Sequence, residues 1–142
     1  MKLLTFALAC AWVASPFGNT VPQMDPYDSY GSIPWADEKA HLDNFALFLE
    51  QQKDTVGYII AYGGRRSCAN EARDRARRAR AYVVSRGIPA SRLKWIDGGY
   101  REEATVVLQP ASRSVPKPTA SPTLKRNQVQ IVRNCKSKTN LR

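Results

Sequence analysis

Arginines crowd one stretch of the chain, and the residue types there allow two interpretations. Residues 62–82 read YGGRRSCANEARDRARRARAY. Guanidinium groups pair with carboxylates and phosphates, and glycines let a backbone approach an anion closely. A solvated helix face gives the same pattern, because Glu71 precedes Arg75 and Asp74 precedes Arg78 by four residues. The stretch therefore indicates either a surface that binds an acidic ligand or an ordinary helix with a charged outer face.

A second pair of glycines extends the candidate site. Each Gly-Gly pair follows an apolar run, and parallel strands would bring both pairs to one end of a sheet, where ligands of open α/β sheets bind. The first pair would lie beside a helix N-terminus, which favours anions. Tight turns that need positive φ explain the glycines equally well. The predicted ligand-binding edge consists of Gly63, Gly64, Arg65, Arg66, Arg75, Gly98, Gly99 and Arg101.

Catalytic and metal-binding chemistry find little support in the residue types. His41 is the single histidine, and it lies beside the apolar stripe of a predicted helix. The cysteines lack the spacing of a zinc site. The basic surface lacks the interleaved aromatic side chains that single-stranded nucleic acids stack on. We therefore expect no catalytic residue, metal, cofactor or nucleic-acid partner.

The net charge of +10 is concentrated near the C-terminus. Residues 111–142 contain eight Lys or Arg and no Asp or Glu, whereas residues 37–110 contain 13 basic and 10 acidic residues. The chain is therefore a nearly balanced domain followed by a basic segment, which could dock to an acidic partner.

The first residues are typical of an export signal. Lys2 precedes an uncharged, largely apolar run at 3–14, and small residues follow it. A membrane-spanning helix needs roughly 20 apolar residues, so we expect a signal peptide at 1–15 and no transmembrane segment in the mature chain. Lipidation at Cys10 and a buried N-terminal helix are the alternatives. Export leads to the periplasm, the cell envelope or the medium.

Removal of the signal would leave two cysteines, Cys68 and Cys135, in a compartment that permits disulfides. We predict that they are bonded, because no metal-ligand partners surround either one. Two unrelated thiols are the alternative.

The hydrophobic pattern predicts two helices and several strands. Apolar residues at helical spacing predict helices from about 37 to 51 and from about 69 to 86, the second with a narrow stripe of alanines. Strands are expected at 56–62, 91–100 and 104–109, with a last one within 128–135 and a short one near 30–33. A strand–helix–strand crossover favours a parallel pair. The expected fold is α+β or α/β, a small mixed sheet with both helices on one face and an extra C-terminal strand.

Composition divides the chain into five parts. The predicted signal peptide at 1–15 precedes an extended lead-in at 16–34 and a domain at 35–110. A Pro-rich linker follows at 111–123, and a basic C-terminal segment with one strand ends the chain at 124–142.

Three segments resemble OmpA-like domains of the C-terminal, peptidoglycan-associated type. LDNFALFLEQQ at 42–52 is similar to the first helix of that family, and GYIIAYGGRR at 57–66 is similar to its strand and Gly-containing loop. The segment at 73–100 carries the most specific matches, which are Arg75-Ala76, Tyr82-Val83, Gly87-Ile88 and Gly98-Gly99-Tyr100. The resemblance covers roughly residues 35–109 and implies the element order β-α-β-α-β-β.

The resemblance also implies a function. Family members commonly bind peptidoglycan, with a loop Asp and a helical Arg that grip the diaminopimelate group. The Arg falls on Arg75, whereas the Asp position falls near Gly64 or Arg65, where no acid stands. The implied protein is a divergent member that lacks the ligand-binding Asp.

Two functions follow from these observations. The first is an exported, non-catalytic envelope or extracellular domain, binding or structural, that recognises a cell-wall carboxylate or an acidic partner. The alternative is an accessory subunit that docks to a larger, outer-membrane-associated envelope assembly through its basic C-terminal segment and has no small ligand.

Overall fold

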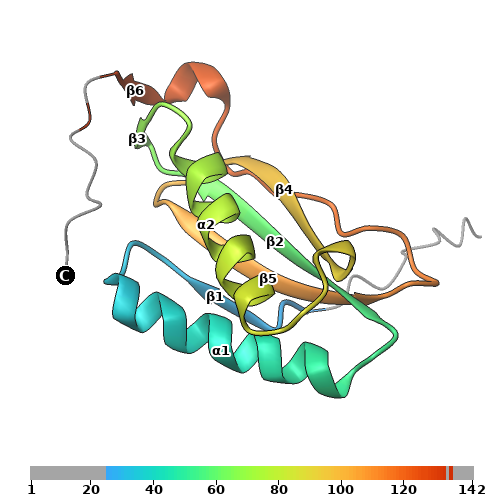
Figure 1. Ribbon diagram of the computed structural model, residues 1–142. Helices are drawn as coiled ribbons and strands as arrows, with labels where there is room; N and C mark the ends of the chain where they lie inside the picture. Colours follow the sequence, from blue (N-terminus) through green and yellow to red (C-terminus); the bar gives the residue numbers. More distant parts are fainter. Residues whose placement is uncertain (1–24, 134, 136–142) are drawn as a thin grey trace, which may run out of the picture.

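Two helices lie against one face of a sheet in the computed structural model, which describes residues 25–133 and 135 (Figure 1). The predicted signal peptide and Cys10 lie outside the described residues. The elements are β1 (Asp28–Tyr30), α1 (Trp35–Gln51), β2 (Thr55–Gly63), β3 (Arg66–Cys68), α2 (Glu71–Ser85), β4 (Leu93–Tyr100), β5 (Thr105–Ser112) and β6 (Gln130–Val132).

Four of the strands form a mixed sheet in the order β1-β5-β2-β4. β2 and β4 are parallel neighbours connected through α2, whereas β5 runs antiparallel to both β1 and β2. β6 pairs in parallel with β3. The short strand β3 was not predicted from the sequence. The main sheet and its helices thus follow the order β-α-β-α-β-β. The expected small mixed α+β fold, with an extra C-terminal strand, is confirmed.

Both predicted apolar stripes form the main core. On α1 the fully buried apolar residues are Leu42, Phe45 and Leu49, and on α2 they are Ala76, Ala79 and Val83. Small side chains let α2 lie close to the parallel pair β2 and β4, because no long side chain separates the helix from the sheet. Ala69, predicted as the first residue of the stripe, is exposed ahead of the helix.

The two ends of α2 are set by residues with positive φ. Asn70 stands just before the helix at φ 63°, and asparagine tolerates this left-handed conformation better than most residues. Gly87 ends the helix region at φ 98°, as the sequence predicted.

The opposite face of the sheet is covered by the Pro-rich segment rather than by a helix. Strand β5 continues through Pro110 to Ser112, so the predicted strand end at Pro110 is wrong. Ala120 then packs against a second buried cluster that includes Ile60 and Tyr62. The backbone N–H of Ser121 donates to the Tyr62 hydroxyl at 3.1 Å. Part of the predicted linker is therefore a structural cover for the sheet.

The predicted pairing of Cys68 with Cys135 is confirmed, since their sulfur atoms lie 1.97 Å apart. The bond joins the end of β3 to the chain just after β6, so it secures the small sheet covalently.

Arg92 connects the C-terminal end of α1 to the start of β4 from a buried position. The residue is only 7% exposed. Its guanidinium donates hydrogen bonds to the carbonyls of Leu49, Gln52 and Thr55 at 2.6 to 3.1 Å. A cation suits the end of a helix, where carbonyl groups lack partners and the helix dipole is negative.

We expect Arg92→Met to lower the free energy of unfolding by about 2–4 kcal/mol, because charge-assisted hydrogen bonds are lost and buried carbonyls lose their donor. Urea denaturation followed by circular dichroism measures the change. Lys94→Met, at an exposed position two residues away, is the control and should leave the midpoint nearly unchanged. Equal midpoints for both variants would contradict this role of Arg92.

Replacing both Cys68 and Cys135 by serine should lower the free energy of unfolding by about 4 kcal/mol, because a bridge between residues 67 positions apart restricts the unfolded chain. Denaturation of the oxidised wild type and of the double variant measures this difference. Reduction of the wild type should reproduce the effect, and an oxidised protein no more stable than the variant would argue against it.

Candidate functional site

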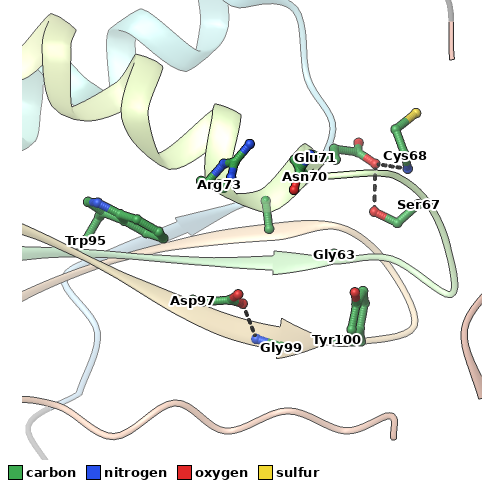
Figure 2. A pocket seen from close by; sticks show the side chains of 11 residues that line it. Gly63, Ser67, Cys68, Asn70, Glu71, Arg73, Trp95, Asp97, Gly99 and Tyr100 are labelled. Carbon is green, nitrogen blue, oxygen red and sulfur yellow. Dashed lines mark hydrogen bonds between the residues drawn. The ribbon is translucent and has the colours of Figure 1, made fainter. Parts of the chain in front are cut away.

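A pocket of about 200 Å³ lies where β2 and β4 end beside the start of α2 (Figure 2). Two strands, the β3 turn and the first turn of α2 contribute to it. Its lining residues are Gly63, Ser67, Cys68, Asn70, Glu71, Ala72, Arg73, Trp95, Asp97, Gly99 and Tyr100. This is the carboxyl end of the parallel pair, where the sequence placed the ligand-binding edge.

Gly63 and Gly99 line this pocket, and close packing at Gly63 and at the neighbouring Gly98 leaves no room for side chains there. A Cβ atom on Gly63 would lie 2.9 Å from the Tyr100 ring, and one on Gly98 would lie 2.5 Å from the Tyr62 ring. Gly98 and Gly99 lie inside β4 rather than beyond it, and the strand register shifts at this point. Gly99 adopts φ 79°. The second Gly-Gly pair therefore forms a bulge within the strand.

The two predicted loops lie side by side. The backbone N–H of Arg101 donates to the Gly63 carbonyl at 2.9 Å, and that of Arg65 donates to the Glu102 carbonyl at 3.1 Å. The structure thus joins the segment 63–66 to the segment 98–102, as the sequence analysis expected.

Arg65 forms an ion pair with Glu102 on the neighbouring loop. Its Nε and Nη2 atoms each donate to a different carboxylate oxygen at 2.7 Å. This hydrogen bonding lowers the pKa of Glu102 and raises the pKa of Arg65. Both side chains are more than half exposed. Near the position where the family has its Asp, the positive charge of Arg65 is therefore balanced by an acid.

Arg101 turns toward the other face of the sheet. Its guanidinium lies 3.7 Å from the centre of the Tyr62 ring, and its Nη2 donates to the Ser121 hydroxyl at 2.8 Å. It binds the covering segment to the sheet. Arg66 is exposed in β3, next to the two loops.

Arg75 leaves the edge and reaches the loop between β1 and α1. Its Nη2 donates to the Gly31 carbonyl at 2.6 Å, and its guanidinium lies 5.9 Å from the centre of the Tyr30 ring. Its Nη1 is buried and has no hydrogen-bond partner within the described part of the chain. The structure thus separates Arg75 from the other predicted site residues, because β1 and β4 are opposite edges of the sheet.

The carboxylate of Glu71 lies at the N-terminus of α2, where the sequence predicted that an anion would bind. Its Oε2 accepts hydrogen bonds from the Ser67 hydroxyl at 2.8 Å and from the Cys68 backbone N–H at 2.9 Å. The positive end of α2 therefore already has a carboxylate beside it, with Asp74 also in the first turn.

Sequence reasoning missed the residues that shape the pocket, above all Trp95, Asp97 and Arg73. One signal was present, because side chains alternate along a strand and the buried Leu93 identifies the face toward the helices. Trp95 and Asp97 share that face. Their exposure follows from the position of β4 at the edge of the sheet, which the sequence does not reveal.

Within the described residues, no group of three or more His, Cys, Asp or Glu side chains is placed to hold a metal ion. The helices described there include none that is long and apolar enough to cross a membrane. His41 lies on α1, where its Nδ1 is 2.6 Å from Asp28. Comparisons of the chain with protein-family models, curated proteins and solved structures gave no match.

We expect Gly98→Ala to destabilise the fold by about 1–3 kcal/mol, because the added methyl group would overlap the buried Tyr62 ring. Thermal or urea unfolding measures the change. Gly31→Ala is a matched control, since the nearest atom to a Cβ there is 3.8 Å away. Equal stability of the two variants would show that the ring moves aside without strain.

Proposed function

We propose that this chain is an exported, non-catalytic OmpA-like domain that works in the cell envelope or outside the cell as a binding module. The observation that carries the proposal is the β-α-β-α-β-β order of the main sheet, together with a pocket at the carboxyl end of its parallel pair. The disulfide is consistent with a location in an oxidising compartment.

Arg75 supports recognition of a cell-wall carboxylate or of an acidic partner. It stands at the position that the resemblance assigns to the ligand-binding Arg, and its Nη1 lacks a hydrogen-bond partner in the described structure.

A pull-down on purified peptidoglycan sacculi tests the wall-binding form of this proposal. We expect the wild type to sediment with sacculi and Arg75→Ala to lose most of this binding. Arg77→Ala, on the exposed side of the same helix, is the control and should bind as the wild type does. Absence of wild-type binding, or equal binding of both variants, would remove a role for the wall carboxylate.

The basic C-terminal segment favours a second candidate, docking to a larger envelope assembly. The described cations of this segment, and of the Pro-rich stretch before it, are Arg113, Lys117, Lys125, Arg126 and Arg133, and residues 111–142 contain no acid. Deletion of the segment is a poor test, because Ala120 and Leu124 pack against the domain. A variant in which the exposed lysines and arginines of this segment are changed to glutamine separates docking from folding. It should fold as the wild type does but no longer co-purify with the assembly.

A further inference from the structure

We propose that the pocket in Figure 2 binds one pyranose ring of a glycan, with Trp95 as the stacking surface. The inference deepens the proposed binding function and names a ligand class for a second place on the domain. It does not depend on Arg75, which lies toward the β1 side of α2 rather than the β4 side.

Trp95 offers an indole ring that the fold does not bury. The residue is 36% exposed, although Leu93 on the same face of β4 is 1% exposed. Figure 2 shows Trp95 at one end of the pocket and Tyr100 at the other. The face of an aromatic ring carries partial negative charge, so it attracts the weakly positive C–H groups on the flat side of a sugar ring.

Two polar side chains line the pocket between the indole and Tyr100. Arg73 approaches from α2, and Asp97 lies on β4, where its Oδ1 accepts a hydrogen bond from the Gly99 backbone N–H at 2.9 Å. The Nε of Arg73 is 3.6 Å from Asp74, which is longer than a hydrogen bond. A donor and an acceptor placed opposite each other suit the hydroxyl groups around a sugar ring, since each hydroxyl can both donate and accept.

Charge and size disfavour small dianions and ligands larger than one sugar ring. Carboxylates of Asp97 and Glu71 both line the pocket, so a phosphate or a small dianion would be repelled. A volume of about 200 Å³ is below the range of roughly 300–1,000 Å³ that is usual for drug-sized ligands. One ring with an apolar face and a polar rim fits these conditions.

Isothermal titration calorimetry with three soluble tetrasaccharides tests the inference. The probes are chitotetraose, cellotetraose and tetragalacturonate, which differ in their acetamido, hydroxyl and carboxylate groups. We expect saturable binding of at least one. Trp95→Ala should weaken it by about tenfold or more, because a stacked aromatic surface is lost. Asp97→Asn, which keeps the volume of the side chain, should weaken it severalfold.

Leu47→Ala, at an exposed position on the distant α1, is the control and should bind as the wild type does. Circular dichroism of each variant establishes that it is folded. If none of the three glycans binds the wild type, or if Trp95→Ala and Asp97→Asn both bind unchanged, the inference is overturned.

The sacculus experiment separates this inference from the proposed function. Wild-type binding to sacculi without binding of any tetrasaccharide would remove the sugar site and leave the wall-binding function. Binding of a tetrasaccharide without binding to sacculi would support the sugar site and remove the function at the wall.

Discussion

The buried carboxylate of Glu38 sets how the two helices and the first strand meet. The residue is 1% exposed on α1, and it accepts hydrogen bonds from Arg78 of α2 at 2.5 Å and from the Tyr30 hydroxyl of β1 at 3.2 Å. A buried charge without a partner would be strongly destabilising, so the fold must bring Arg78 to this point. Burial, and to a smaller extent the charge of Glu38, raise the pKa of Tyr30, so its hydroxyl keeps the proton that it donates. This contact and the packing of the alanine stripe against the sheet together fix the rotation of α2 about its axis.

That rotation gives each arginine of α2 a separate role. With Arg78 directed at α1, the alanine stripe faces the sheet, and Arg80 reaches the carbonyls of Leu93 and Ala90. Arg75 reaches the β1–α1 loop, while Arg73 and Arg77 stay exposed. The density of arginines, which at first indicates a polyanion-binding face, thus serves largely to bind α2 to its neighbours.

The parts of the fold that the sequence predicted are those governed by local periodicity. The stripes of α1 and α2 repeat within a few residues, so burial is visible in the pattern. The partners of the arginines were not predictable, because Arg65 and Glu102 are 37 residues apart and Arg75 and Gly31 are 44 apart. The packing of the Pro-rich segment over the second face of the sheet was not predicted for another reason. Few apolar residues of that segment contact the core, so its sequence shows no pattern of burial. The place of the pocket was expected, but side chains that shape it, such as Trp95, were missed because they depend on a strand edge and a bulge.

The distribution of charge decides what the candidate site can recognise. Arg65 is paired with Glu102, and Arg101 is stacked on Tyr62, so two of the predicted cations are occupied by the fold itself. Glu71 and Asp97 add negative charge beside the pocket. An acidic ligand would therefore find its donor on the β1 side of α2, at Arg75, whereas the β4 side offers an aromatic ring with a donor and an acceptor beside it. Because β1 and β4 are opposite edges of one sheet, the two places lie on opposite sides of α2, and an extended polymer could contact both only by crossing that helix.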